Sequence, residues 1–365
     1  MTKRHKQFGI LFGIAAVTAW MGSAVAADAD GASNGHDRFT FALWGDTPYS
    51  AAERDTVIPA LIQDINASQV DFSVFDGDIK SGSTQCVNTV FAEAIDRFNT
   101  FAAPMIYVPG DNEWTDCHRI NNGSFNALER LEYLRATMFA VPESFGQSRL
   151  LLEHQDGYPE NTRWSYGDVV FVGLNVPGSN NNKVNPGQCT SAKSSRTLSD
   201  CAADNAEYAA RDAANIQFLD ESFQVAIANH ARGLVVTVQA DPSFDLPETE
   251  TDNERTCVRA GQGECLDPPD STNLNLANYD GYNNFLADLK AQTIAFGSAG
   301  GQVLFVHGDT HYFKVDRPGF DDALHPLANF VRICTFGSPN IHWVKVTVDI
   351  HSRNLFAIEP MTVRP

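Results

Sequence analysis

The sequence predicts an α/β fold, because short apolar strands alternate with amphipathic helices along the chain. The first strand is expected at residues 39–44, and Ser50 with Glu53 forms a capping box that opens a helix running towards Asn66. The alternation continues through a strand, a helix, a strand and a helix at residues 71–75, 87–101, 105–108 and 124–139. Strands joined by helices through short connections indicate a parallel sheet with crossover helices.

The second half of the chain continues the pattern around two long polar segments. Residues 164–166 and 169–174 are expected to form a hairpin. The remaining elements are a long helix ending near residue 229, a strand at 234–238, a helix at 282–295 and strands at 303–306 and 344–350. Because no repeat or change of composition marks a boundary, we expect one domain over residues 27–365, with loop insertions at about 177–203 and 241–280.

The N-terminus has the features of a secretory signal. Positively charged residues at 3–6 precede an apolar run at 8–21, and small residues at 23–26 end in an Ala-x-Ala cleavage site. A membrane anchor is the rival interpretation, but it needs about 20 apolar residues. We therefore expect residues 1–26 to be removed on export to the periplasm or the cell exterior. No later stretch of the sequence is apolar enough to span a bilayer.

The composition is that of an acidic globular protein. The chain has 26 Lys and Arg against 45 Asp and Glu, a net charge of −19, and 43% hydrophobic residues, which permit a full core. An acidic surface repels nucleic acid and anionic membranes, so we expect neither as a partner. A site for a small phosphorylated substrate would need local positive charge, which metal ions can supply. The sequence does not indicate an oligomeric state.

Seven cysteines in an exported chain predict disulfides, because the compartment is oxidising. Two pairs are separated by short polar loops, Cys189 with Cys201 and Cys257 with Cys265, and a third bridge would join Cys86 to Cys117. The spacing does not determine the connectivity, so other pairings stay open. Cys334 lies in an apolar run and is expected to be a buried free thiol.

Four Gly-Asp pairs, each at the end of an expected strand, contribute four aspartates and a nearby histidine: Asp46, Asp78, Asp111, Asp309 and His311. Any single Gly-Asp pair is ordinarily a turn or a helix cap. Because the carboxyl ends of strands line the ligand crevice of an open α/β sheet, the four pairs together predict side chains that meet in one place. Carboxylates crowded in this way repel one another unless a cation lies among them, so the pattern predicts a metal site.

In the order and spacing of these motifs, residues 39–350 resemble the calcineurin-like metallophosphoesterase family. The family pattern runs Asp-x-His, Gly-Asp, Gly-Asn-His-Asp/Glu, a lone histidine after a strand, and Gly-His-x-His. The matching points are Asp46, Gly77-Asp78, Gly110-Asp111-Asn112-Glu113, Gln239 and Gly308-Asp309-Thr310-His311. The resemblance implies a central β-sandwich flanked by helices, in four layers, that holds two metals.

Several ligand positions depart from the family pattern. Pro48, which offers a metal no donor atom, stands at the family's first histidine, and Gln239 stands at its lone histidine. Asp111 replaces a metal-binding asparagine, and Asp309 replaces the first histidine of the last motif. Replacement by other oxygen donors rather than by apolar residues favours retained cation binding. The alternative is a degenerate site that binds no metal.

The resemblance implies two ligand sets that share Asp78. The first set is Asp46, Asp78 and His311, and the second is Asp78, Asp111, Asp309 and Gln239. Sites rich in oxygen donors favour hard cations, so we expect one or two ions of Mg²⁺, Mn²⁺ or Ca²⁺ rather than Zn²⁺.

Four further residues are candidates for catalysis or substrate binding. Asn112 stands where the family has the histidine that assists the leaving group, and its amide can bind a phosphoryl oxygen but cannot deliver a proton. His118 could supply that proton and Arg119 could clamp phosphate, the alternative being a surface His–Arg pair beside a structural cysteine. Tyr49 could contact a substrate, although an aromatic residue just after a strand usually closes the core.

Two functions from different classes remain open. The first is an exported, metal-dependent phosphoric ester hydrolase that uses metal-activated water. The second is a non-catalytic protein of the same fold that binds a metal, a ligand or a partner, which Pro48, Asn112 and Gln239 favour. The sequence has no Gly-x-Ser-x-Gly elbow, no reactive-cysteine signature and no phosphate loop after the first strand, which disfavours nucleophilic hydrolases, kinases and dehydrogenases.

Overall fold

The computed structural model of this chain describes residues 37–242 and 280–364, without residues 320, 322 and 324. The predicted signal at residues 1–26 therefore lies outside the described residues, as does most of the second predicted insertion with Cys257 and Cys265. The division into one domain over residues 27–365 stays a prediction.

The first of two sheets has five strands in the order β12-β11-β1-β2-β3. Strands β1 (Arg38–Trp44), β2 (Phe72–Phe75) and β3 (Met105–Tyr107) are parallel, and each is followed by a helix or a short helical turn. Strands β11 (Trp343–Asp349) and β12 (Phe356–Met361) are antiparallel to their neighbours at the other edge. The three N-terminal strands therefore end at the same edge of this sheet.

The second sheet has seven strands in the order β4-β5-β6-β7-β8-β10-β9. Strands β6, β7, β8 and β10 are parallel, whereas β4, β5 and β9 are antiparallel to their neighbours. Their bounds are β4 Glu153–Gln155, β5 Tyr158–Tyr166, β6 Val169–Gly173, β7 Gly233–Thr237, β8 Gln302–His307, β9 Lys314–Asp316 and β10 Phe330–Cys334. The parallel pairing with crossover helices that the alternation of elements indicated is present in β1, β2 and β3, and antiparallel strands at the edges make both sheets mixed.

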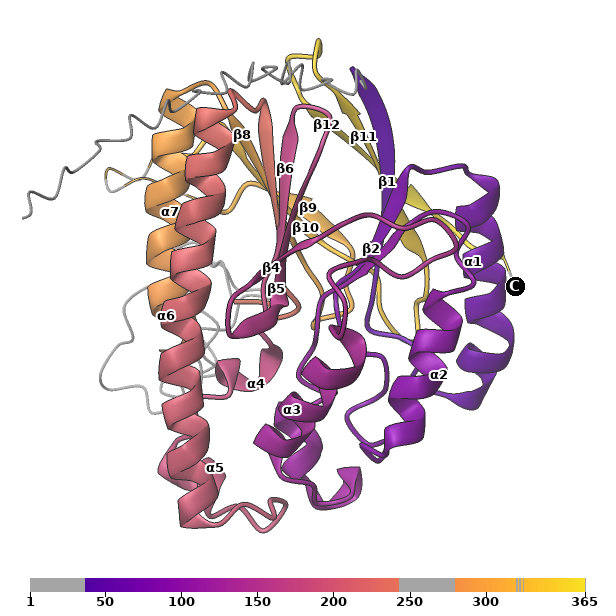
Figure 1. Cartoon of the computed structure of the whole chain (residues 1–365), viewed down its shortest axis with the longest axis vertical. Coiled ribbons are helices and arrows are strands. Elements are labelled where there is room, and N and C mark those ends of the chain that lie inside the picture. The colour runs from indigo at the N-terminus through magenta and orange to yellow at the C-terminus, as the bar shows by residue number, and fades with distance from the viewer. Residues whose placement is uncertain (1–36, 243–279, 320, 322, 324, 365) are drawn as a thin grey trace, which may run out of the picture. The chain divides into compact units, whose positions relative to one another are not determined.

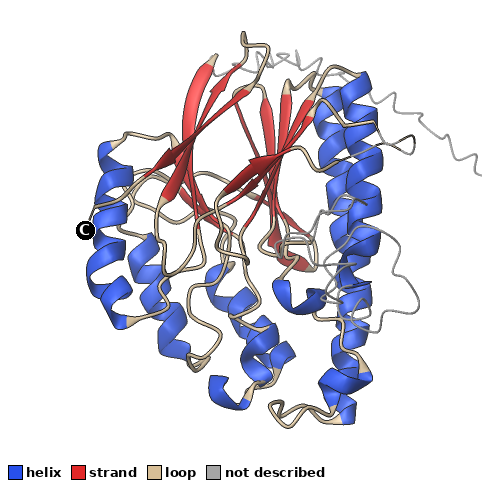
Figure 2. Cartoon of the chain, turned by 180° about the vertical axis from the view of Figure 1, so that it is seen from behind, coloured by secondary structure: helices blue, strands red, loops and turns tan. Residues whose placement is uncertain are grey.

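Helices cover the outer face of each sheet, so the described part of the chain has four layers (Figures 1 and 2). The first sheet carries α1 (Ile58–Ala67), α2 (Asn88–Phe98) and α3 (Ala127–Met138), whose apolar faces share one core with it. The second carries α6 (Leu198–Ala228) and α7 (Asn283–Ser298), which run side by side. A central sandwich flanked by helices is the fold class that the family resemblance implied, and it is confirmed.

The two sheets are joined face to face by an apolar core between them. Phe41 and Phe72 of the first sheet stack with ring centroids 5.3 Å apart, and Phe171 of the second meets Phe41 edge to face at 5.3 Å. Every second residue of a strand points inward, so these side chains lock the relative position of the sheets.

Short elements make up the connections near the strand ends. They are a π-helical turn at Glu53–Val57 before α1, 3₁₀ turns at Thr115–His118, Ile120–Asn122 and Asp280–Tyr282, and the four-residue helices α4 (Gly178–Asn181) and α5 (Pro186–Cys189). The predicted capping box forms by half: Ser50 Oγ accepts from Glu53 N at 3.2 Å, but the Glu53 carboxylate accepts from Tyr49 N instead of Ser50 N. Among the described helices, none is long and apolar enough to cross a membrane.

Two of the predicted disulfides are present. Cys86 pairs with Cys117 and Cys189 with Cys201, and Cys334 is a buried free thiol, as the sequence predicted. Cystines of this kind are typical of proteins that fold in an oxidising compartment.

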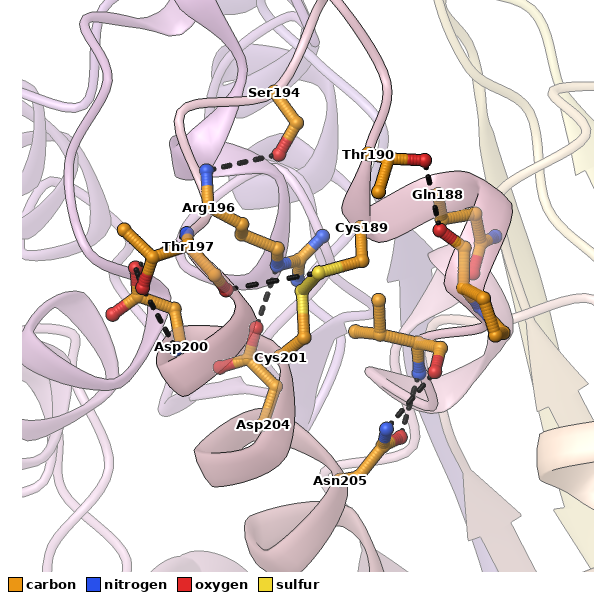
Figure 3. Close-up of a disulfide and its surroundings, with 12 residues drawn as sticks. Gln188, Cys189, Thr190, Ser194, Arg196, Thr197, Asp200, Cys201, Asp204 and Asn205 are labelled. Atoms are coloured by element: carbon orange, nitrogen blue, oxygen red, sulfur yellow. Dashed lines mark hydrogen bonds and ion pairs between the residues drawn. A yellow bond between two sulfur atoms is a disulfide. The ribbon is translucent and has the colours of Figure 1, made fainter.

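The second disulfide clips a loop onto the start of the longest helix (Figure 3). Cys189 ends α5 and Cys201 lies in the first turn of α6, where Thr197 caps the helix by accepting from Asp200 N. Asn205, one turn further along, exchanges two hydrogen bonds of 2.8 and 2.9 Å with the backbone of Val184. The bridge and these bonds together fix the segment between α4 and α6.

Replacing both Cys189 and Cys201 by alanine should lower the free energy of unfolding by about 2–3 kcal/mol, because the bridge closes a short loop in the unfolded chain. Urea unfolding of the oxidised proteins measures the difference. The matched variant lacking Cys86 and Cys117 should lose more, since that bridge spans 31 residues rather than 12. An unchanged urea midpoint in the variant that lacks Cys189 and Cys201 would show that this bridge does not stabilise the fold.

Candidate active site at the strand ends

Three of the four Gly-Asp turns share an unusual backbone. Asp46, Asp78 and Asp309 have φ values of +47°, +66° and +71°, in the left-handed region. The turns after β1 and β2 are bonded to each other, Asp46 N donating to Gly77 O at 2.8 Å and Thr47 N to Asp78 O at 3.1 Å. A left-handed conformation at a non-glycine residue costs about 1 kcal/mol or more, and such strain clusters at functional sites. The backbone at these three strand ends is therefore strained.

Glycines let the carboxylates of different turns approach one another. A Cβ atom on Gly110 would lie 2.2 Å from Asp78 Oδ1. A Cβ atom on Gly178 would lie 2.8 Å from Asp111 Oδ2 and 3.0 Å from Asp309 Oδ1. Both contacts are too close for any side chain, so these two positions need glycine for the aspartates to converge.

The turns surround a cavity of about 520 Å³. Seven of the ten residues predicted for the site line it: Tyr49, Asp78, Asp111, Asn112, Arg119, Asp309 and His311. The other three, Asp46, His118 and Gln239, are not among the lining residues. Motifs that are far apart in the sequence therefore contribute side chains to one cavity.

Asp78 lies at the centre of a hydrogen-bond network. Its Oδ2 accepts from the Tyr49 hydroxyl at 2.7 Å and from Asn112 Nδ2 at 2.5 Å, and its Oδ1 accepts from Asn112 N at 3.0 Å. Burial and the nearby charges of Asp111, Glu113 and Asp46 raise the pKa of Asp78 well above its ordinary value. Burial and Asp78 likewise raise the pKa of Tyr49, so its phenol stays protonated and donates.

Asp46 does not line the cavity but orders the last motif. Its Oδ2 accepts from Asp309 N at 3.0 Å, and its Oδ1 lies 3.5 Å from His311 Nε2. Burial lowers the pKa of His311, but the contact with Asp46 and a 2.6 Å bond between Nδ1 and Ser338 O outweigh burial and raise it. The imidazole of His311 is thereby oriented with Nε2 towards Asp46.

A second hydrogen-bond network surrounds Ser179, which also lines the cavity. Ser179 Oγ lies 2.7 Å from Asp111 Oδ2, 2.8 Å from Asp116 Oδ1 and 3.2 Å from Arg119 Nη2. Arg119 also forms an ion pair of 2.6 Å with Asp116. Burial and Asp111 raise the pKa of Asp116 to about 7, against the opposing effect of Arg119. Arg119 is the only Lys or Arg side chain among the described residues that line the cavity.

His118 and Gln239 take other places. His118 Nδ1 lies 2.9 Å from Ser194 Oγ, and burial together with Arg196 and Arg119 lowers the pKa of His118 to about 3, so the ring is neutral at pH 7. The predicted role of His118 as a proton donor stays a prediction that this geometry does not favour. Gln239 is buried, accepts from Gly178 N at 2.6 Å and donates to Asp309 Oδ1 at 3.3 Å. Gln239 therefore links two of the turns.

The sequence motifs did not identify several residues of this region. Ser179 and Asp116 line the cavity, and Asp76 is fully buried near Asp46, with its Oδ1 lacking a hydrogen-bond partner within the described part of the chain. Asp76 stands in Asp76-Gly77-Asp78, where a second carboxylate beside a Gly-Asp pair was a usable signal. Ser179 had none, because it lies in a loop rich in Ser, Asn and Gly.

The donor chemistry of the cavity fits hard divalent cations. Five aspartates, three side-chain amides and one imidazole are among the described residues that line it, and no thiol is. Oxygen donors are what Mg²⁺, Mn²⁺ and Ca²⁺ prefer. A cation would also offset the burial and the repulsion from Asp111 that together raise the pKa of Asp78. In the placement that the described residues have, no three His, Cys, Asp or Glu side chains lie close enough to hold one ion together.

The fold and the site define an α/β protein in which two mixed sheets between helical layers present an acidic cavity at their strand ends.

No family model matches the sequence, and no match was found among curated proteins. Among solved structures, GAP50, described as the anchor in the inner membrane complex of Plasmodium, is 13% identical with a TM-score of 0.43, over 90% of each chain. TT1561 of Thermus thermophilus is 10% identical with a TM-score of 0.40, over 89% of this chain and 99% of its own.

A third solved structure is the purple acid phosphatase PPD1 from yellow lupin seeds. It is 12% identical with a TM-score of 0.43, over 86% of this chain and 50% of its own. All three likenesses are distant, and none of them carries an argument about the site. Membership of the metallophosphoesterase family therefore stays an expectation from the sequence motifs.

Proposed function

We propose that this protein is a metal-dependent hydrolase of small phosphoric esters that acts outside the cytoplasm. The observation that carries the proposal is the convergence of aspartates from separate strand ends on one cavity that also contains Arg119. Two of these aspartates, Asp78 and Asp309, are held in a left-handed backbone, a strain that clusters at functional sites. The two disulfides support a location in an oxidising compartment.

The expected ligand sets share Asp78, with Asp46 and His311 on one side and Asp111 and Asp309, joined by Gln239, on the other. One or two ions of Mg²⁺, Mn²⁺ or Ca²⁺ bound there would lower the pKa of a water molecule and draw charge from the phosphoryl oxygens. The acidic cavity disfavours a phosphate in the absence of such ions, because like charges repel.

The protein's own side chains would bind and orient the substrate. Arg119 can donate to phosphoryl oxygens, and its ion pair with Asp116 limits the orientations of the guanidinium. Asn112 and Tyr49, which now donate to Asp78, can redirect a hydrogen bond to a ligand oxygen. Gln188 of the clipped loop and Asn180 also line the cavity and can contact the remainder of the substrate.

A second candidate function is a non-catalytic binding protein with the same fold. It is favoured by the closure of the network around Asp78, whose Oδ2 accepts from both Tyr49 and Asn112. Pro48 in place of a histidine removes one donor atom, in keeping with this alternative.

Metal content and hydrolysis of the mature protein distinguish the two candidates. The protein would be dialysed with Mg²⁺, Mn²⁺, Ca²⁺ or Zn²⁺ in turn, analysed for bound metal, and assayed with an aryl phosphate monoester and a diester. We expect stoichiometric binding of a hard cation and hydrolysis that a chelator abolishes. Bound metal without hydrolysis of either ester would favour the binding protein, and no bound metal would refute the site.

A further inference from the structure

The turn at residues 178–182 has a backbone that L-amino acids avoid. Ser179, Asn180, Asn181 and Asn182 have φ values between +52° and +60°, four consecutive residues in the left-handed region. In that region Cβ crowds the following carbonyl oxygen, and asparagine tolerates it better than most other residues do. Serine at the first position therefore stands out, because glycine or asparagine would fit with less strain.

Neighbouring elements hold this turn in place through its asparagines. Arg211 of α6 is fully buried and donates to Asn181 O at 2.9 Å and to Asn181 Oδ1 at 2.5 Å. The Tyr282 hydroxyl accepts from Asn181 N at 3.2 Å and donates to Pro177 O at 3.0 Å. Neither anchor uses the side chain of Ser179. The strain in the turn thus serves to place that side chain rather than to close the fold.

The Ser179 hydroxyl lies at a junction between charges of opposite sign. It contacts Asp111 Oδ2 at 2.7 Å and Asp116 Oδ1 at 2.8 Å, and it accepts from Arg119 Nη2 at 3.2 Å. A hydroxyl can donate to one carboxylate while it accepts from a guanidinium. Asp111 and Arg119 come from the loop after β3, so this single atom joins both of them to a turn on the other sheet.

We propose that Ser179 is a positioning residue whose hydroxyl orients Asp111 and Arg119 so that the cavity can bind a phosphoryl-type anion. The inference rests on the proposed function, since it assigns the anion to the same cavity. The strained turn sets the hydroxyl between the two side chains, and the guanidinium keeps donors directed at the cavity instead of turning wholly to Asp116. An Arg119 side chain without this contact has more rotamers to lose on binding.

Ser179→Gly distinguishes an effect on phosphate binding from an effect on stability. It removes the hydroxyl, which should lower phosphate affinity, and it relieves the left-handed strain, which should not lower stability. The probe is inorganic phosphate, titrated calorimetrically into the Mn²⁺-treated protein, with the melting temperature recorded in parallel. We expect Ser179→Gly to weaken phosphate binding at least about tenfold while its melting temperature equals or exceeds that of the wild type. Ser179→Ala should weaken phosphate binding similarly without the gain in melting temperature.

Ser124→Gly is the matched control, since Ser124 is an exposed serine with φ of +57°. It should raise the melting temperature in the same way and leave phosphate affinity unchanged. Phosphate affinity of Ser179→Gly within about twofold of the wild type would overturn the inference, as would a wild-type protein with no affinity for phosphate. If the wild type binds phosphate but hydrolyses no ester, the proposed hydrolase activity is refuted. The proposed role of Ser179 is then tested by the phosphate affinities of its variants.

Discussion

Asp78→Asn is expected to abolish hydrolysis and weaken metal binding while the protein stays as stable as the wild type or becomes more stable. Asp78 is shared by both expected ligand sets, so a neutral amide there should reduce kcat/KM by at least about 100-fold. The buried carboxylate is itself unfavourable, because burial and the charges of Asp111, Glu113 and Asp46 raise its pKa. Loss of function with unchanged stability is the signature of a functional residue.

The stability difference should depend on pH in a defined direction. A carboxyl with a raised pKa in the folded protein keeps its proton longer than in the unfolded chain, so it destabilises the fold as the pH rises above about 4. In metal-free buffer, the advantage of Asp78→Asn in urea unfolding should therefore grow between about pH 4 and pH 7. Asp55→Asn is the control, since Asp55 is exposed and its ion pair with Arg54 lies at the surface. Full activity in Asp78→Asn would refute the proposed site.

Arg211→Ala should be the most destabilising single substitution considered for this fold. The guanidinium is fully buried, donates to Asn175 O at 2.8 Å and to Asn181, pairs with Glu207 at 2.6 Å, and lies 5.1 Å from the ring centre of Trp114. Its removal takes the guanidinium donors away from both oxygens of Asn181 and from Glu207 Oε1 and leaves a cavity in the interior, which costs about 3–5 kcal/mol. Urea unfolding followed by tryptophan fluorescence measures the loss.

The same substitution should also disturb the cavity, because Arg211 holds the turn that presents Ser179. We expect weaker binding of phosphate in Arg211→Ala even at temperatures where the protein remains folded. Arg54→Ala serves as the comparison, since Arg54 is exposed and its ion pair with Asp55 at the surface should contribute little to stability. A wild-type unfolding midpoint for Arg211→Ala would show that the buried network carries no stability.

Local patterns predicted the elements of the fold well. The apolar runs at 39–44, 71–75 and 105–108 became β1, β2 and β3, and the amphipathic segment after residue 124 became α3. The spacing of apolar residues in these segments matches the face that each element buries, so the local sequence suffices to identify them. Boundaries moved by a few residues, as at α2, which ends at Phe98 rather than near residue 101.

Pairing between strands was not accessible in the same way. The alternation of elements indicated the parallel pairing of β1, β2 and β3. It did not indicate that β5 extends back to Tyr158 and pairs with the short strand β4, or that β9 pairs antiparallel with β10. The two-sheet arrangement was expected only through the family resemblance. Which strands pair depends on the burial of both faces and on closure of the core, and no local window of sequence contains that information.

The sequence by itself determined which residues carry the chemistry of the site: the Gly-Asp turns at strand ends, the cysteine pairs at short spacing and the acidic balance of the chain. Only the tertiary structure decided which of them line the cavity. The turns that come together there lie far apart in the sequence, Asp46 and Asp309 by 263 residues. It placed His118 against Ser194 and brought in Ser179, which no motif marks. A motif is a local property, whereas a site is a set of distances that the packed core imposes.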